Sequence, residues 1–206
     1  LPDLSTRSVP ELIDMLQCEN GPRRLMAQRL LMQRNESGTT SALRKLAGTS
    51  YPLSRAHAIW TLHGMNTLDD QTLRSAANHD SSNLRLQAMR IAAERADTPE
   101  TRDLVLQRLG DTDPGVRRHA AAALAHLDVA DISQPLVSVL TRHPDDDMLR
   151  TVVVAGAHGE ELDLLDAMIW DPHWISPSAS HRKLFDAVAR TAVRDEDPHQ
   201  RVRLLE

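Results

Sequence analysis

The amino-acid sequence predicts an all-α fold, a right-handed α-α superhelix of about six helix pairs. Arginines recur at intervals of 30 to 33 residues, each near the start of an apolar segment with helical spacing. Their positions are Arg24, Arg55, Arg85, Arg117, Arg150 and Arg182. A fixed period of this size is typical of stacked two-helix units. The only run of β-branched residues, 152–154, occupies a position that is helical in the other repeats, so no β-sheet is expected.

Each repeat is expected to hold two helices. The first helices are predicted at about 8–17, 40–47, 69–78, 99–109, 131–142 and 160–170. The second helices are predicted at about 22–34, 54–65, 83–95, 114–127, 147–157 and 178–194, with a further helix beginning near Pro198. Threonine or aspartate followed by proline marks helix starts at 98–99, 113–114 and 197–198. The first side chain can cap free amides, and proline fits the first helical turn.

The stretch DTDPGVRRHAAAALAHL, residues 111–127, predicts a thin stacking surface. Four apolar residues in it share one helical stripe, and the alanines beside them let neighbouring helices approach closely. The stripe consists of Val116, Ala120, Leu124 and Leu127. An alanine also stands three residues after the arginine in each of the first four repeats, at Ala27, Ala58, Ala88 and Ala120. The fifth repeat has Val153 there and the sixth has Phe185, so the geometry of residues 182–206 is left open.

The repeated arginines are expected to have a structural role, with ligand binding as the alternative. Acidic residues stand beside three of them, at Asp80, Asp113 and Asp147. We expect Arg24, Arg55, Arg85, Arg117 and Arg150 to form, with these acids, a ladder of charge-assisted hydrogen bonds at the turns between helices.

Composition narrows the classes of function. The net charge is −5 and only Lys45 and Lys183 are lysines, which argues against a non-specific nucleic-acid binder. Cys18 is the only cysteine, which excludes an internal disulfide, a paired-cysteine zinc site and a covalent haem motif within these residues. No segment is apolar enough over about 18 residues to span a membrane, so no direct membrane insertion is expected.

No motif of catalysis or metal binding stands out. Pairs of histidines on one helix are six or seven residues apart, not the three or four that place two ligands on one face. Neither a phosphate-binding glycine loop nor a nucleophile elbow is present. The sequence therefore predicts no catalytic residue, cofactor or metal site in this chain.

A candidate partner-binding surface follows from the exposed side of the second helices. Counting two and five residues from each repeated arginine predicts one stripe of polar and aromatic side chains. Its members are Arg29, His57, Trp60, Gln87, Arg90 and His119. A tryptophan flanked by arginines is a plausible docking surface for a protein or an acidic partner. The alternative is that Trp60 fills a space between helices with the arginines stacked on it.

The break between helices at 169–177 is a second candidate. Trp170 and Trp174 lie close together there, although aromatic residues make up only 2% of the chain. They are expected either to cover the end of the helix stack or to meet a neighbouring domain.

The segment DPGVRRHAAAALAHL resembles the second helix of HEAT repeats, in the HEAT/armadillo-like superfamily. A wider similarity covers most of the chain. The segments GPRRLMAQRLLMQR, ALRKLAG and SRAHAIWTLHGMNTLDDQTLRSAANHDSSNLRLQAMRIAAE resemble the HEAT-repeat region of planctomycete-type membrane-bound dehydrogenases. In that family the region lies between a β-propeller resembling sugar dehydrogenases and a C-terminal c-type cytochrome domain. The resemblance implies a connecting module of an exported or periplasmic redox protein, with haem c in a downstream domain.

Residues 1–206 are thus expected to form a single HEAT-like domain, cut from a larger multidomain protein. The predicted function is a non-catalytic scaffold that contacts flanking domains of the same polypeptide or another protein. The sequence leaves the oligomeric state open. The alternative is an enzyme whose fold carries the site, as in HEAT-like DNA glycosylases or phycobilin lyase-like proteins. Trp60 with Arg29 and Arg90 supports a DNA-binding role, whereas the scarcity of lysine and the net acidity oppose it.

Overall fold

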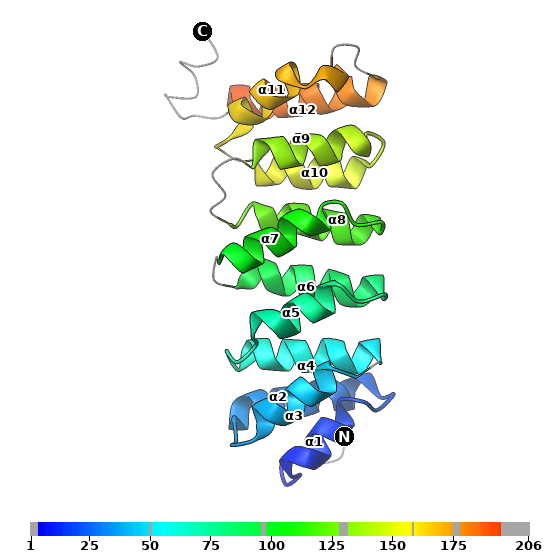
Figure 1. Cartoon of the computed structure of the whole chain (residues 1–206), viewed down its shortest axis with the longest axis vertical. Coiled ribbons are helices and arrows are strands. Elements are labelled where there is room, and N and C mark those ends of the chain that lie inside the picture. Colours follow the sequence, from blue (N-terminus) through cyan, green and yellow to red (C-terminus); the bar gives the residue numbers. More distant parts are fainter. Residues whose placement is uncertain are drawn as a thin grey trace. The chain divides into compact units, whose positions relative to one another are not determined.

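Helices make up the regular structure of every segment that the computed structural model describes (Figure 1). The described residues are 4–49, 51–95, 98–127, 132–157, 159–174 and 178–194. Within these ranges there are twelve α-helices, one short 3-10 helix and no strand. The predicted fold class, an all-α fold of the α-α solenoid type, is confirmed. The helix predicted near Pro198 and its cap at Asp197 lie outside the described residues.

The chain divides into two compact units, Leu1–Ala92 and Ala93–Glu206. The helices that begin in the first unit are α1 (Val9–Met15), α2 (Gly21–Arg34), α3 (Thr39–Ala47), α4 (Pro52–Gly64), α5 (Asp70–Ala77) and α6 (Ser82–Glu94). The second unit holds α7 (Pro99–Arg108), α8 (Pro114–Leu124), α9 (Ser133–Arg142), α10 (Asp147–Gly156), α11 (Glu161–Trp170), the 3-10 helix Pro172–Trp174 and α12 (Ala179–Arg194). These bounds follow the predicted order of helix pairs. The expectation of a single domain over 1–206 stays a prediction.

Helix pairs stack on one another within each unit. In the first unit α1 packs against α2 and α3 against α4, while α2 contacts α4 and α1 contacts α3 in the next layer (Figure 1). In the second unit α7 packs against α8 and α11 against α12, and α8, α10 and α12 contact one another in succession. Each unit therefore has the layered packing expected of repeats that bury their apolar faces against neighbours.

The small residues that follow each repeated arginine lie in the core. Ala27, Ala58, Ala88 and Ala120 are all fully buried, and Val153 is 1% exposed. Helices also approach closely where α10 meets the end of α8. A Cβ atom added to Gly156 of α10 would lie only 2.9 Å from the Cβ of Ala125. The alanine-rich segment thus serves to bring helices together, as its composition predicts.

The α8 helix ends three residues earlier than predicted. Beyond Leu124 the chain tightens, since the amides of His126 and Leu127 donate to carbonyls three residues earlier. The predicted stripe nevertheless holds, because Val116, Ala120, Leu124 and Leu127 are all buried.

Side-chain caps fix several helix starts. The Asp113 carboxylate accepts hydrogen bonds from the amides of Gly115 at 2.8 Å and Val116 at 3.1 Å. The Thr98 hydroxyl accepts from the amide of Thr101 at 3.2 Å. Both caps confirm the predicted pairing of a capping side chain with proline. Asn20, Asp69 and Asp146 cap α2, α5 and α10 in the same way.

The last helix pair departs from the repeat. In α12 the buried stripe consists of Leu184, Val188 and Ala192, so it begins two residues after Arg182 and not three. Phe185, at the usual buried position, is 37% exposed. No helix in the described segments is long and apolar enough to cross a bilayer.

Candidate functional site

A groove opens on the first unit among α2, α4 and α6, and we call it the Trp60 groove. Its volume is about 730 Å³. The apolar residues that line it are Leu25, Tyr51, Pro52, Leu53, Ala56, Trp60 and Leu84. The polar residues that line it are Gln28, His57, Ser81, Asn83, Gln87 and Arg90. None of these lining residues is aspartate or glutamate, although the chain as a whole is acidic.

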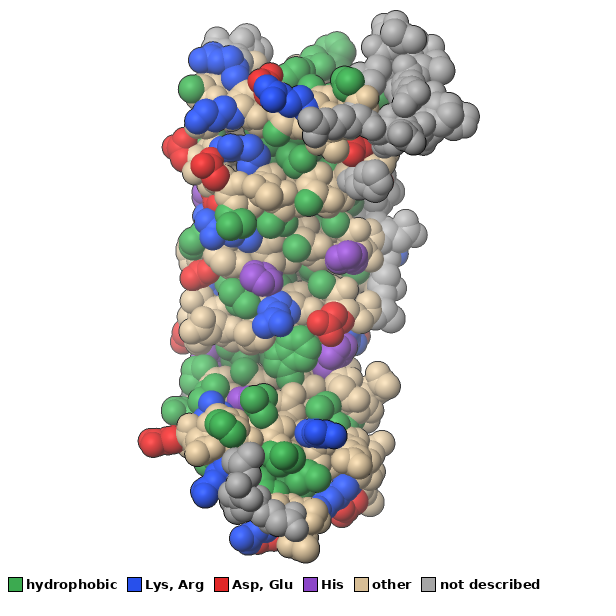
Figure 2. Space-filling view, turned by 180° about the vertical axis from the view of Figure 1, so that it is seen from behind, with side chains coloured by type: hydrophobic (Ala, Val, Ile, Leu, Met, Phe, Trp, Pro, Cys, Tyr) green, Lys and Arg blue, Asp and Glu red, His purple; other side chains and the backbone are tan. Residues whose placement is uncertain are grey.

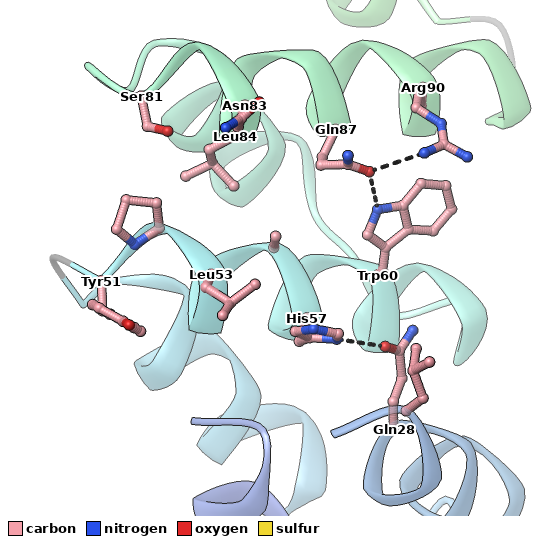
Figure 3. A pocket seen from close by; sticks show the side chains of 13 residues that line it. Gln28, Tyr51, Leu53, His57, Trp60, Ser81, Asn83, Leu84, Gln87 and Arg90 are labelled. Atoms are coloured by element: carbon pink, nitrogen blue, oxygen red, sulfur yellow. Dashed lines mark hydrogen bonds between the residues drawn. The ribbon is translucent and has the colours of Figure 1, made fainter. Parts of the chain in front are cut away.

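The Trp60 side chain links α4 to α6 across the groove (Figure 3). Its indole N–H donates a hydrogen bond of 2.8 Å to Oε1 of Gln87. The Arg90 guanidinium lies 5.5 Å from the centre of the indole ring, and its Nη1 also donates to Gln87 Oε1, at 3.4 Å. A cation over an aromatic face is worth about 0.5–1 kcal/mol at an exposed site. Trp60, Gln87 and Arg90 therefore form one connected cluster.

His57 is held below this cluster by two side chains of α2. Nε of Arg24 donates to Nε2 of His57 at 3.1 Å, so this ring nitrogen must carry a lone pair. The other ring nitrogen, Nδ1, then carries the proton and donates to Oε1 of Gln28 at 2.9 Å (Figure 3). Partial burial and the nearby charge of Arg24 lower the pKa of His57. The ring is therefore neutral at pH 7 and has a single tautomer.

Four of the predicted partner-binding residues come together at this groove: His57, Trp60, Gln87 and Arg90 line it. Arg29 does not line it, and its side chain is exposed on α2 one residue beyond Gln28. In the N-terminal part of the face drawn in Figure 2, hydrophobic side chains lie beside arginine and histidine side chains.

Sequence reasoning missed the contribution of α2 and of the first turn of α4. Leu25 and Gln28 stand one and four residues after Arg24, not two and five, because α2 borders the groove only through the side that faces α4. Tyr51 and Leu53 could have been found from the sequence, since both are apolar and lie at the start of a predicted helix.

His119 belongs to the second unit, on α8. Its Nδ1 lies 2.9 Å from the carbonyl oxygen of Gly115, one turn earlier in the same helix. The carbonyl can only accept, so Nδ1 is the donor. His119 is thus bonded to its own helix.

The first five repeated arginines share one geometry: the guanidinium of each donates to the backbone carbonyl six residues before it. This carbonyl lies in the turn between the two helices of a pair. The donor–acceptor distances are 2.7 Å from Arg24 to Cys18, 3.3 Å from Arg55 to Thr49, 2.9 Å from Arg85 to His79, 2.8 Å from Arg117 to Asp111 and 3.5 Å from Arg150 to Pro144. Three of the arginines also donate to the next carbonyl, those of Glu19, Asp80 and Thr112. We call this arrangement the arginine clamp.

The acidic residues of the predicted ladder have separate roles. Asp80 accepts from Arg85 through its backbone oxygen. The Asp113 carboxylate caps α8. Asp147 forms the predicted pair with Arg150, inside α10. A link between layers does occur in the second unit, but through another residue.

That link is the Asp146 carboxylate at the start of α10. It accepts from Nε of Arg118 at 2.9 Å and lies 4.0 Å from Nη2 of Arg117. It also accepts the amide of Leu149 at 2.9 Å. These bonds and the two arginines lower the pKa of Asp146 although its partial burial acts in the opposite direction.

The two tryptophans of the break after α11 differ in environment. Trp174 is 8% exposed, its indole N–H donates to the Thr141 hydroxyl of α9 at 3.0 Å, and its ring centre lies 4.6 Å from that of His181. Trp170 is 82% exposed at the end of α11. Trp174 therefore holds the last helix pair to α9, whereas Trp170 offers an open indole surface.

A metal-binding cluster of three or more His, Cys, Asp or Glu side chains is absent from the described part of the chain. The Trp60 groove combines hydrogen-bond donors with apolar surface.

Comparison with known families identifies a match over the middle of the chain. A family model described as HEAT repeats matches residues 70–157. No curated protein matches the chain significantly. The matched residues run from the start of α5 to the end of α10. The chain therefore contains a HEAT-repeat region.

Proposed function

We propose that this chain is a non-catalytic interaction module that binds another protein at the Trp60 groove. HEAT repeats generally act as protein-interaction scaffolds, and the fold is typically non-catalytic. The observation that carries the proposal is the groove itself, which combines Trp60, Tyr51 and Arg90 with exposed leucines. Tryptophan, tyrosine and arginine dominate the binding energy of protein interfaces, especially beside apolar pockets.

The exposure of the groove residues supports a partner surface. Leu25 is 61% exposed, Tyr51 57% and Leu53 39%. Covering such side chains removes apolar area from water at about 25 cal/mol per Å². Trp60 is already held by Gln87 and Arg90, so little side-chain entropy remains to be lost when a partner covers it.

Site-specific photo-crosslinking tests this proposal. A benzoyl-phenylalanine at Leu53 should capture a partner from an extract of the source cells, identified by mass spectrometry. The same group at Met148 of α10, which is 57% exposed and lies in the second unit, is the matched control. The identified partner should bind the purified chain, and Trp60→Ala should weaken that binding at least tenfold. Equal capture at both positions, or full affinity in the Trp60→Ala variant, would contradict the proposal.

The absence of catalysis is tested separately. The purified chain, mixed with sugars or alcohols and a redox dye, should show no turnover. Turnover by the chain alone would contradict a non-catalytic role.

We also propose a setting for the module: a larger exported redox protein in which it connects flanking domains. The support is the resemblance of its sequence to the repeat region of membrane-bound dehydrogenases, and no cofactor is assigned to these residues. Haem c would belong to a downstream domain. The coding sequence of the parent protein should contain a β-propeller upstream and a Cys-x-x-Cys-His motif downstream. Flanking regions with neither feature would contradict the proposal of a redox parent protein but not that of an interaction module.

A further inference from the structure

The hydrogen bonds within the Trp60 groove occupy side-chain acceptors and leave donors exposed in the groove. The indole N–H of Trp60 can only donate, so the group it contacts on Gln87 must be the carbonyl oxygen Oε1. Arg24 can also only donate, which fixes His57 Nδ1 as a donor and Gln28 Oε1 as its acceptor. Both glutamine carbonyls are thus engaged inside the protein.

The amide nitrogens of the same glutamines remain for a ligand. In Figure 3 the nitrogen of each glutamine is turned away from the side chain that holds its oxygen. Arg90 adds a guanidinium that forms no ion pair with any described residue and is exposed to solvent. Gln28 of α2 and Gln87 and Arg90 of α6 therefore present hydrogen-bond donors on the two sides of Trp60, and Arg90 is a cation (Figure 3).

The remaining lining of the groove is mostly apolar, with His57, Ser81 and Asn83 as its other polar residues. Leu25, Leu53 and Leu84 also line the groove, and no carboxylate does. A ligand that matches this surface has hydrogen-bond acceptors, a negative charge and an aliphatic or aromatic side chain. A carboxylate meets a guanidinium with two parallel hydrogen bonds, which adds geometric specificity.

We propose that the groove binds a short acidic peptide segment with a hydrophobic anchor residue. The anchor packs against Leu25 and Leu53, backbone carbonyls accept from the amide groups of Gln28 and Gln87, and an Asp or Glu carboxylate pairs with Arg90. This inference rests on the proposed function, since it names the chemistry of the partner at the same groove.

Two other occupants fit the groove less well. A basic peptide would place its cations beside Arg90 with no carboxylate lining the groove to receive them. A nucleic acid binds mainly through several phosphate contacts, and Arg90 is the only Lys or Arg among the lining residues. Both are outcomes that the following experiment distinguishes.

The test is selection from a random dodecapeptide phage library on the purified chain, with counter-selection on a Trp60→Ala variant. Selected peptides should carry Asp or Glu within three residues of an aliphatic or aromatic residue. The tightest of them should lose five- to tenfold in affinity with Arg90→Gln, measured by fluorescence anisotropy. Arg29→Gln is the matched control, because Arg29 is an exposed arginine outside the groove, and it should change affinity less than twofold.

Charge reversal gives the sharpest readout. Arg90→Glu should abolish binding of the acidic peptides and select peptides with Lys or Arg beside the hydrophobic residue. Circular dichroism of each variant, together with the binding of basic peptides by Arg90→Glu, verifies that the variants remain folded. Selection of basic peptides by the unaltered chain, or equal affinity of Arg90→Gln and the parent chain, would overturn the inference.

The outcomes also separate this inference from the proposed function. A partner protein captured at Leu53, with no groove-dependent peptide selected, would overturn the peptide inference while the interaction module stands. Binding of a single-stranded oligo-dT at low salt that is lost with Arg90→Gln would overturn it in favour of nucleic acid. If no partner is captured at Leu53 and no peptide is selected, both the proposed function and the peptide inference are overturned.

Discussion

Replacing Arg117 tests the arginine clamp where it is most deeply buried. Arg117 is 7% exposed and donates to the carbonyls of Asp111 at 2.8 Å and Thr112 at 3.1 Å. In Arg117→Met the apolar stem is kept, but both carbonyls lose their donor. The variant therefore isolates the two hydrogen bonds.

The expected cost follows from the burial of each bond. A buried hydrogen bond with a charged donor is worth about 1.5–3 kcal/mol, and that to Asp111 is of this kind. The hydrogen bond to Thr112 is partly exposed, so water can replace it in part, and its loss should cost about 0.5–1.5 kcal/mol of stability. The contact with Asp146 at 4.0 Å adds little, because Arg118 still binds that carboxylate. Arg117→Met should lower the free energy of unfolding by about 2–4.5 kcal/mol.

Urea unfolding followed by circular dichroism measures this change. Arg190→Met is the matched control, since Arg190 pairs with Asp186 on an exposed surface of α12. Such a pair contributes about 0–1 kcal/mol, so the control should remain close to the unaltered chain. Arg117→Lys should lie between the two, because one ammonium keeps the charge but cannot reproduce the guanidinium fork. A loss below about 0.5 kcal/mol in Arg117→Met would refute the structural role of the clamp.

Three further perturbations follow from the structure. Gly156→Ala should destabilise the second unit by about 1–3 kcal/mol in urea unfolding, because the new Cβ lies 2.9 Å from that of Ala125; a stabilised variant would contradict the close packing. The pKa of His57 is lower in the folded chain, so the unfolded chain binds the proton first, and stability should fall as the pH drops below about 6.5. His57→Gln should reduce this dependence of stability on pH, and an unchanged dependence would contradict the hydrogen bonds of His57 with Arg24 and Gln28. Trp174→Phe should lower the free energy of unfolding by about 1 kcal/mol through loss of its indole hydrogen bond, whereas Trp170→Phe should have no effect on unfolding; equal effects would contradict their different burial.

The fold could be predicted from the sequence because its signals are local and repeated. The spacing of the arginines gives the length of a layer, and the alanines three residues later identify the buried stripe. Caps such as Asp113 with Pro114 mark helix starts within one or two residues. The stripe of α12 was left open, because Lys183 and Phe185 depart from the repeat without indicating that the buried residues begin one position earlier.

The hydrogen-bond partners could not be predicted in the same way. An arginine near an aspartate in sequence suggests a carboxylate partner, yet Arg85 reaches the backbone oxygen of Asp80. Turn geometry decides this, because the chain folds back and places carbonyls five and six residues earlier within reach. Sequence spacing does not contain that geometry.

The candidate site was predictable in part. His57 and Trp60 share a helix, and Gln87 and Arg90 follow at the same offsets in the next repeat, so counting from the arginines groups them. Packing against α4 decides which side of α2 faces the groove. The positions counted from the repeated arginines do not specify this packing. The difference between buried Trp174 and exposed Trp170 depends on a contact with α9, more than thirty residues away in the chain.

Amide hydrogen exchange with and without the partner captured at Leu53 tests the central claim most directly, namely that the Trp60 groove is the docking surface. Protection on binding should concentrate at residues 25–28, 51–60 and 83–90, and it should disappear with Trp60→Ala. Protection confined to the second unit, with these three segments unchanged, would contradict the account.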